Sequence, residues 1–317
     1  MEPRTARLIA PAKLNLGLRV LYKRSDGFHE LRTLFQTISL ADEITVSYAP
    51  GRGREVTLAS ELNIPNNLIV QAAEALLEET GARGMVHFSL KKRIPMGGGL
   101  GGGSTNAAAV LLALPTLLGK RVPINVLATI GAKLGSDVPF FLYGGRALGL
   151  GRGTELYPLP DGLAEALVLV VPGFPVATPD AYCALSARLA SDGGAAAVSE
   201  FEAELWQGEG RRFFGPKASV VNDFEPVVFE QFPELIKIQK KLAQTGASPA
   251  GMTGSGSTMY GVYESPATAA EAVARLKPWQ AITAKTMTRR AYRKMWLRQL
   301  RNHVDSETWP PRSKWGK

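Results

Sequence analysis

A glycine-rich segment, residues 95–105, is the part of this sequence whose composition points most directly to chemistry. Every position from Gly97 to Gly103 except Leu100 is glycine. Glycine loses more backbone freedom on folding than any other residue, so such a run is typical of places where the backbone approaches a ligand closely. We expect a strand before the segment and a helix after it, and the N–H groups that begin a helix bind anions, phosphate above all. The sequence therefore predicts a phosphate-binding loop; a flexible linker is the alternative, which the flanking elements disfavour.

The residues around the glycines narrow the class of phosphate-binding loop. A Walker loop has a lysine before its final Ser or Thr, whereas Gly103 is followed directly by Ser104. Three of the glycines match the spacing of a dinucleotide-binding fingerprint. However, no Asp or Glu occurs between Asn106 and Ser136, where a ribose-binding carboxylate is expected. The Walker class is excluded and a nicotinamide enzyme is disfavoured.

Two charged residues, Lys13 and Asp137, lie in segments with strong local patterns. Leucine or valine at every second position from Leu14 to Val20 predicts a strand with one buried face, and Lys13 and Asn15 point together to the opposite face. Asp137 lies in a short turn that follows an expected helix. Taken alone, a lysine on such a strand is most often solvated, and an aspartate in such a turn most often caps a helix.

Length and composition indicate a folded globular protein. The chain has 317 residues, 45% of them hydrophobic and 21% charged, which is typical of two domains or one large α/β unit and excludes a disordered, collagen-like or coiled-coil chain. No apolar run is long enough for a membrane helix and no signal peptide begins the chain, so we expect a soluble, cytoplasmic protein. The single cysteine, Cys183, excludes an intrachain disulfide, and three scattered histidines predict no structural or other metal site.

Most of the net charge of +9 lies at the C-terminal end. Residues 285–317 hold ten Lys or Arg and two acids, a balance of +8, which leaves +1 for the rest of the chain. Such a basic end could touch nucleic acid, acidic lipid or a partner protein. Prolines and Ser313 in its last part favour a solvated or partly disordered tail instead. Nucleic acid and membranes are not expected partners, and nothing in the sequence indicates an oligomeric state.

Hydrophobic periodicity predicts strands and helices along both halves of the chain. The expected helix after the glycines has Ser104 as a plausible N-cap, and Pro115 should end or kink it because proline lacks the N–H that bonds the carbonyl of Leu111. The expected strands are Ile44–Tyr48, Glu55–Ala59, Val86–Leu90 and Leu167–Val171, and the expected helices are Asn67–Glu79, Ser104–Leu114 and Ile124–Leu134.

Three motifs in order resemble those of the superfamily of galactokinase, homoserine kinase, mevalonate kinase and phosphomevalonate kinase (the GHMP kinases). They are Pro11–Leu16, Pro95–Ala107 and Gly251–Ser257. The resemblance implies an α+β fold with an N-terminal domain of the ribosomal S5 domain 2 type and a ferredoxin-like C-terminal domain, with the active site between them. It places an N-terminal GHMP domain at residues 1–160, a C-terminal GHMP domain at residues 161–290 and a basic tail at residues 291–317.

Within this superfamily, the sequence is most similar to the 4-diphosphocytidyl-2-C-methyl-D-erythritol kinases of the non-mevalonate isoprenoid pathway. The resemblance implies phosphorylation of the substrate's 2-hydroxyl by ATP, with Mg²⁺ accompanying the nucleotide and a small molecule as the partner. The stretches that carry it are Ala10–Asn15, Ser25–Leu31, Gly135–Phe141, Gly145–Ala147, Gly151–Gly153 and Asn222–Glu225.

The resemblance also implies roles for individual residues. Asp137 matches the general base and Lys13 the lysine that keeps it ionised. Asn67 resembles the start of a segment that lines the adenine pocket, although a helix-start asparagine explains it as simply. The residues implied to bind ATP are Asn67, Pro95, Met96, Gly97, Gly98, Gly99, Leu100, Gly101, Gly102, Gly103, Ser104 and Thr105.

The cytidine end of the substrate needs aromatic faces and groups that hydrogen-bond the base edge. Phe28 stands where the family usually has a tyrosine, Tyr182 matches the opposite stacking aromatic, and His29 would contact the edge of the cytosine. Asn15 and Thr178 complete the implied substrate residues. Without the resemblance, the two aromatics would be core residues and His29 a surface turn residue.

Two other functions compete with this interpretation. Another kinase of the superfamily, acting on homoserine or mevalonate, would keep Lys13 or the glycine loops without the cytidine-stacking pair. A nucleic-acid-binding protein would act through the basic tail, and its binding would weaken steeply with salt.

Overall fold

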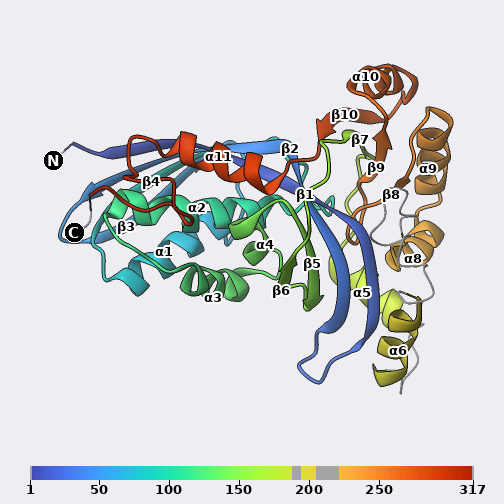
Figure 1. Ribbon diagram of the computed structural model, residues 1–317, viewed down its shortest axis with the longest axis horizontal. Helices are drawn as coiled ribbons and strands as arrows, with labels where there is room; N and C mark the ends of the chain where they lie inside the picture. The colour runs from blue at the N-terminus through green and yellow to red at the C-terminus, as the bar shows by residue number, and fades with distance from the viewer. Residues whose placement is uncertain (1, 188–193, 205–220, 316–317) are drawn as a thin grey trace.

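The computed structural model describes residues 2–187, 194–204 and 221–315. Two sheets, each with its own helices, lie side by side along the longest axis of the molecule (Figure 1). No helix in the described residues is long and apolar enough to cross a membrane.

The first sheet is built on two long antiparallel strands. Its order is β3-β4-β2-β5-β6, with β1 paired to β2 outside this path. The strands that we expected around Leu14–Val20, Ile44–Tyr48, Glu55–Ala59 and Val86–Leu90 are confirmed, the first two within longer strands. The six strands are β1 (Arg4–Lys23), β2 (His29–Pro50), β3 (Arg54–Ser60), β4 (Gly84–Lys91), β5 (Arg146–Gly151) and β6 (Glu155–Pro158).

Strand β1 bends because its pairing with β2 is interrupted by irregularities at Pro11/Lys13, Asn15/Gly17 and Val20/Tyr22. Bulges of this kind increase twist and redirect side chains. The far ends of β1 and β2 stay paired with each other and thereby reach the second half of the molecule (Figure 1).

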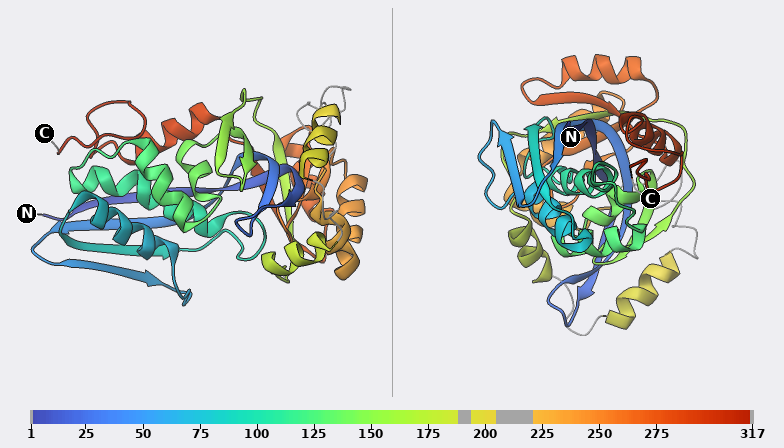
Figure 2. Two further views of the ribbon diagram at one scale, coloured as in Figure 1. Left: turned by 90° about the horizontal axis from the view of Figure 1, so that it is seen from below. Right: turned by 90° about the vertical axis from the view of Figure 1, so that its left-hand side faces the viewer.

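Helices cover one face of the first sheet (Figure 2). The expected helices at Asn67–Glu79 and Ile124–Leu134 are confirmed. Every residue of the central helix from Thr105 to Leu118 is buried, so it forms the middle of the core. The four helices are α1 (Leu68–Thr80), α2 (Gly102–Leu118), α3 (Ile124–Leu134) and α4 (Val138–Tyr143).

Helix α2 differs from its predicted bounds at both ends. It begins after Gly101, which takes the N-cap position, so the prediction of Ser104 as N-cap is wrong. It also continues through Pro115 to Leu118. An interior proline costs about 3 kcal/mol, but Leu117 and Leu118 are both buried and their packing offsets that cost. The prediction that the helix ends at Pro115 is therefore wrong.

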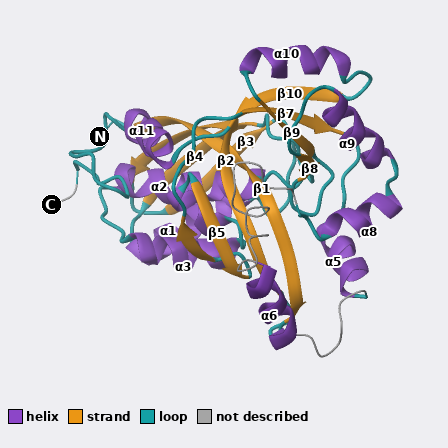
Figure 3. Ribbon diagram, turned by 45° about the vertical axis from the view of Figure 1, so that its right-hand side comes forward, coloured by secondary structure: helices purple, strands orange, loops and turns teal. Residues whose placement is uncertain are grey.

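The second sheet has the ferredoxin-like topology that we expected. Across the sheet its four strands lie in the order β10-β7-β9-β8, and every neighbouring pair is antiparallel. The expected strand Leu167–Val171 is part of it. The strands are β7 (Ala166–Val171), β8 (Ala250–Met252), β9 (Met259–Tyr263) and β10 (Gln280–Lys285), and the helices α5 (Thr178–Ser186), α8 (Phe224–Gln231), α9 (Glu234–Gln244) and α10 (Pro266–Arg275) accompany it (Figure 3). Helix α6 (Gly194–Glu204) lies against β1 instead.

The expected boundary near residue 160 falls between β6 and β7. Backbone hydrogen bonds also join the two halves. The backbone of Leu18 in β1 donates to the carbonyl of Val221 (2.8 Å) and accepts from the N–H of Asp223 (2.9 Å). The bent strand thus continues into the second half and fixes the two sides of the space between them.

The basic C-terminal end is folded, so the expectation of a solvated tail is wrong up to Trp315. Helix α11 (Arg289–Gln299) returns to the first half and packs on β1 (Figure 1). Tyr292, Trp296 and Leu300 are fully buried in the first core. Their spacing of four residues places them on one face of the helix. This apolar face therefore anchors the segment, although its composition suggested a solvated tail.

Candidate active site

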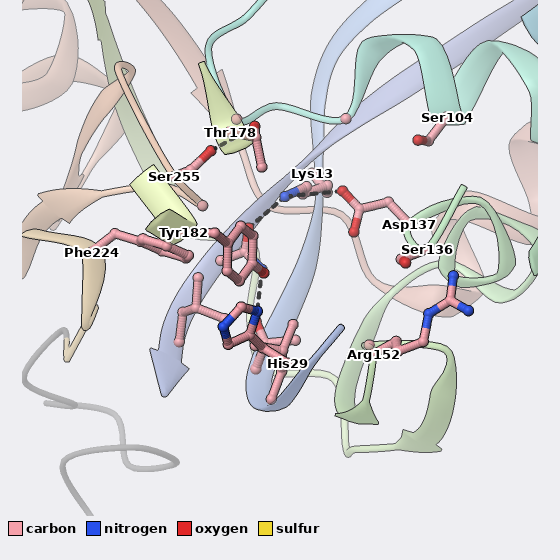
Figure 4. A pocket seen from close by; sticks show the side chains of 18 of the residues that line it. Lys13, His29, Ser104, Ser136, Asp137, Arg152, Thr178, Tyr182, Phe224 and Ser255 are labelled. Carbon is pink, nitrogen blue, oxygen red and sulfur yellow. Dashed lines mark hydrogen bonds and ion pairs between the residues drawn. The ribbon is translucent and has the colours of Figure 1, made fainter. Parts of the chain in front are cut away.

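A cavity of about 740 Å³ opens between the two halves, at the place where the three sequence motifs meet. Strand β1, the glycine loop, the turn before α4, helix α5 and the loop between β8 and β9 all contribute to its wall (Figure 4). The predicted residues that line it are Lys13, Asn15, Phe28, His29, Gly97, Gly99, Gly101, Gly102, Gly103, Ser104, Asp137, Thr178 and Tyr182.

Lys13 and Asp137 form an ion pair at the wall of this cavity. The Lys13 Nζ lies 3.3 Å from Oδ2 of Asp137, and the side chains are 5% and 30% exposed respectively. Lys13 also donates to Oδ1 of Asn15, whose Nδ2 donates to the hydroxyl of Thr33 (2.6 Å). Lys13 is therefore not a solvated lysine, because it is buried and its ammonium group is held between two acceptors.

Asp137 occupies the position before α4, but its side chain makes no capping hydrogen bond. The simple explanation of this residue as a helix cap is therefore not supported. Its carboxylate faces Lys13 and the cavity (Figure 4). A partly exposed carboxylate beside a buried ammonium group is suited to accept a proton from a bound hydroxyl.

The glycine loop owes its path to close backbone contacts. At Gly99 φ is +75°, and a Cβ there would lie 2.3 Å from the carbonyl oxygen of Thr253 in the loop between β8 and β9. The backbone N–H of Lys13 donates to the carbonyl of Leu100 (3.1 Å), which joins the loop to β1. The start of α2 consequently faces the cavity with N–H groups that have no partner within the helix.

The hydroxyl residues that end the loop differ in access. Ser104 lines the cavity, whereas Thr105 is buried behind the loop, where its N–H bonds the carbonyl of Gly101 (2.9 Å). Of these two residues, only Ser104 lies where it could contact a phosphate group directly.

A smaller cavity of about 280 Å³ adjoins the outer side of the glycine loop. Pro95, Met96, Gly98, Leu100 and Asn67 line it. The side-chain oxygen of Asn67 accepts from the N–H of Ile69 (3.0 Å), so this residue also caps α1. Asn67 thus caps a helix, as its simpler explanation predicts, and also lines a cavity, while its place in an adenine pocket stays a prediction.

Aromatic rings gather at the other end of the main cavity. The rings of His29 and Tyr182 stack with centroids 4.8 Å apart, and Nε2 of His29 lies 2.7 Å from the hydroxyl of Ser186. Phe28 is 46% exposed, and the guanidinium of Arg152 lies 3.5 Å from its ring centroid. His29, rather than Phe28, covers Tyr182 in this structure, and Phe28 is not a core aromatic.

Burial shifts the pKa values of both titratable rings in this cluster, His29 and Tyr182. It lowers the pKa of His29, with a smaller contribution from the charge of Lys23. It raises the pKa of Tyr182 well above the ordinary value. Both shifts favour the uncharged form of the ring.

Comparison with known proteins decides the family. The sequence matches the families described as "GHMP kinases N terminal domain" over residues 67–145 and "GHMP kinases C terminal" over residues 212–279. It is 46% identical to the 4-diphosphocytidyl-2-C-methyl-D-erythritol kinase of Solibacter usitatus, over 98% of both chains. The chain belongs to the 4-diphosphocytidyl-2-C-methyl-D-erythritol kinase family. It is thus a GHMP kinase, and kinases of this superfamily use ATP as phosphoryl donor.

Further relatives of this kinase agree in sequence and in fold. The enzyme of the same name from Moorella thermoacetica is 40% identical, over 89% of this chain and 98% of its own. A crystal structure of a 4-(cytidine 5'-diphospho)-2C-methyl-D-erythritol kinase is 36% identical, with a TM-score of 0.72 over 88% of this chain and 98% of that one. Homoserine kinase from Cytophaga hutchinsonii, at 20% identity, a TM-score of 0.69 and coverage of 90% and 95%, shares the fold alone.

The cavity of this kinase contains residues that we did not single out from the sequence. Ser255, whose hydroxyl lies 2.9 Å from that of Thr178, belongs to the third motif, which was a usable signal. Phe224 packs edge-on against Tyr182 at 4.8 Å. Phe224 and Arg152 both lie in stretches that carried the resemblance, Asn222–Glu225 and Gly151–Gly153, which were a usable signal.

Proposed function

We propose that this kinase transfers the γ-phosphoryl group of ATP to the 2-hydroxyl of 4-diphosphocytidyl-2-C-methyl-D-erythritol. The names of the relatives support the substrate. The observation that carries the reaction is the ion pair of Lys13 and Asp137, which faces the same cavity as the start of α2. A hydroxyl bound between them would lie beside a proton acceptor and close to a phosphate-binding loop.

In the proposed reaction, Asp137 accepts the proton of the substrate hydroxyl as its oxygen attacks the γ-phosphorus. The bond from that phosphorus to the bridging oxygen breaks, and ADP leaves with the electron pair. Lys13 keeps Asp137 ionised before transfer and stabilises negative charge that develops on the transferred group. Because phosphoryl transfer depends mainly on positioning and charge stabilisation, these two side chains and the loop N–H groups provide the main requirements.

We infer that the glycine loop holds the ATP phosphates and that the adjoining cavity beside Asn67 and Met96 receives the adenosine. Mg²⁺ would enter with ATP, because this ion usually keeps several waters and binds through phosphate oxygens. Ser104 is the loop hydroxyl placed to reach it. No group of three or more His, Cys, Asp or Glu in the described part of the chain could bind a metal by itself.

We also infer that the aromatic end of the main cavity binds the cytosine. Tyr182 provides a ring face, and His29 provides a neutral imidazole for the base edge. Since these two rings stack on each other here, the base would either displace His29 from Tyr182 or stack on the outer side of the pair. Asn15 would contact the same substrate from β1, and Phe28 from the turn that follows β1.

The substrate assignment is tested by ATP consumption with three acceptors measured separately. We expect turnover with 4-diphosphocytidyl-2-C-methyl-D-erythritol and none with homoserine or mevalonate. Turnover with either of the latter would leave the phosphate loop in place and overturn the assignment of the aromatic cluster.

The base assignment is tested by Asp137→Asn. A positioned general base contributes roughly 10²- to 10⁴-fold to the rate, so kcat should fall by that factor while the Kd for ATP stays within about twofold. Calorimetric titration with ATP and steady-state kinetics give the two quantities. A kcat within tenfold of the unsubstituted enzyme would show that Asp137 is not the base.

A further inference from the structure

A second large cavity lies on the first half of the molecule, away from the catalytic one. It is a groove of about 980 Å³ between α11 and residues 304–307, and it shares no lining residue with the catalytic cavity. We call it the basic groove. Two acids line it, Asp161 and Glu307. Its cationic residues are Arg289, Arg290, Arg293, Lys294, Arg298 and Arg301.

The cations of the basic groove exceed the acids that line it in the described part of the chain. None of the six forms an ion pair within the described residues, and the nearby carboxylate of Asp161 accepts from the backbone N–H of Arg289 (2.6 Å). The Nε of Arg293 is buried without a hydrogen-bond partner in the described residues. Six positive charges against two negative ones therefore face the same space.

Without a bound anion, the charges on α11 repel one another. Arg289 and Arg293, Arg290 and Lys294, and Lys294 and Arg298 are like-charged pairs four residues apart, which repel each other on a helix surface. Positive side chains in the first turn also oppose the helix dipole, and that turn has no acidic residue. Burial and the charge of Arg289 lower the pKa of Arg293. A bound anion would relieve each of these repulsions.

The groove is held rigid from below. Tyr292 and Trp296 on the opposite face of α11 are fully buried, and the guanidinium of Arg289 donates to the carbonyls of Arg146 (2.5 Å) and Leu159 (3.4 Å). The guanidinium of Arg293 lies 5.3 Å from the ring centroid of Trp309. Arg289 and Arg293 are consequently positioned before any ligand arrives, which reduces the entropic cost of binding.

We propose that the basic groove binds a small molecule that carries two or more phosphate groups. Arginine binds phosphate with paired N–H groups, and this groove is rich in arginine. From Arg290 to Arg298 the helix advances about 12 Å at ~1.5 Å per residue, which is too long for one phosphate group. The volume matches that of small-molecule sites. No aromatic ring lines the groove in the described part of the chain, so stacking of nucleic-acid bases has no platform there.

The test is calorimetric titration of the full chain with inorganic pyrophosphate at low salt, with inorganic phosphate as a second ligand. The groove variant carries Arg290→Gln, Lys294→Gln and Arg298→Gln, all at exposed positions. The control variant loses the same charge elsewhere through Lys237→Gln, Lys240→Gln and Lys277→Gln, also exposed. We expect the groove variant to bind pyrophosphate at least tenfold more weakly and the control to bind within twofold of the unsubstituted protein.

Kinase activity separates this site from the catalytic one, and kcat/KM should stay within twofold in both variants. Equal pyrophosphate affinity in the groove variant and the unsubstituted protein would overturn the proposal, because the ligand would then bind elsewhere, as on the glycine loop. Phosphate binding as tight as pyrophosphate binding would overturn the requirement for two groups. A short RNA that binds more tightly than pyrophosphate and is lost in the groove variant would replace the small molecule with nucleic acid.

Discussion

Side chains that are buried and polar at the same time define the catalytic cavity at the scale of single residues. Lys13 is almost completely buried, and a buried ammonium group needs partners to remain charged. Asn15 and Asp137 provide them from one side each. The lysine cannot move far without losing one of these contacts. Its position therefore also restricts where the Asp137 carboxylate can lie.

Tyr182 gives a prediction at the same scale. Stacking of a base on an aromatic ring is worth about 1–3 kcal/mol, so Tyr182→Ala should raise the KM for the cytidylyl substrate about 5- to 150-fold. The KM for ATP should not change, because the glycine loop lies at the other end of the cavity. Tyr182→Phe is the matched control and should retain the KM, since the ring is kept. An unchanged KM in the alanine variant would place the cytosine elsewhere.

At the scale of elements, the active site is assembled by loops that hold one another. The carbonyls of Met252 and Gly254 accept from Nδ2 of Asn222 (2.8 and 2.9 Å), and the N–H of Met252 donates to Glu225 (2.7 Å). The glycine loop in turn packs against Thr253 through Gly99. Changes in the second sheet can therefore reach the glycine loop of the first half through direct contacts.

Two glycines of the phosphate loop should respond differently to the same substitution. Gly99→Ala introduces a Cβ at 2.3 Å from a backbone oxygen and at positive φ, so it should lower both Tm and ATP affinity. Gly103→Ala meets only a methyl group of Leu68 at 3.5 Å, within α2. Alanine is better in helices by about 1 kcal/mol, so Tm should stay level or rise. Differential scanning calorimetry of both variants is the measurement, and equal losses would contradict the packing argument.

Glu225 gives a prediction about pH. Burial raises the pKa of this carboxyl above its ordinary value of 4.5, against opposing hydrogen bonds from Met252 and Gln239. The unfolded chain thus ionises Glu225 first, and the folded state loses stability as pH rises from about 4.5 through the raised pKa. Glu225→Gln removes this loss. Its free energy of unfolding relative to the unsubstituted protein should increase between pH 4.5 and pH 8, measured by urea titration.

A difference between the two proteins that is the same at every pH would refute this account of Glu225. Any constant offset from altered hydrogen bonds to Met252 or Gln239 does not affect the test, because the prediction concerns only the slope with pH.

At the scale of the whole molecule, the C-terminal segment packs against the N-terminal strand. Strand β1 starts the first half, and α11 returns from the second sheet to pack on it. His303 Nε2 lies 2.9 Å from the carbonyl of Thr5, and Ser313 donates to the carbonyl of Thr116 (2.7 Å). The basic C-terminal segment is thus part of the first core, and its charges form the outer surface of a packed helix.

Trp296 provides the corresponding prediction. Replacing a buried tryptophan by alanine typically costs about 3–5 kcal/mol, so Trp296→Ala should lower the free energy of unfolding by that amount. Trp315 is the matched control because 47% of it is exposed, and its replacement should cost less than about 1 kcal/mol, as is usual for exposed positions. Urea unfolding monitored by far-UV circular dichroism measures both. Equal costs would mean that α11 does not stabilise the core.

Local sequence determined the features that depend on neighbouring residues. The six glycines in residues 97–103 indicated a loop with close backbone contacts, for which phosphate binding stays a prediction, and alternation after Lys13 placed Lys13 and Asn15 on one side of a strand. Alanine and leucine indicated the central helix, and the order of three motifs indicated the family. Each signal arises from backbone freedom, side-chain period or motif spacing, which act over a few residues.

Tertiary structure decided what depends on contacts between distant segments. Lys13 and Asp137 lie far apart in sequence, and their 3.3 Å contact, together with the missing capping hydrogen bond, favours a base over a helix cap for Asp137. Burial of Leu117 and Leu118 carried α2 past Pro115, and burial of Trp296 folded a segment whose charge suggested a tail. In each case contacts with residues elsewhere in the chain outweighed the local preference. These contacts form only in the folded molecule, so the local sequence does not reveal them.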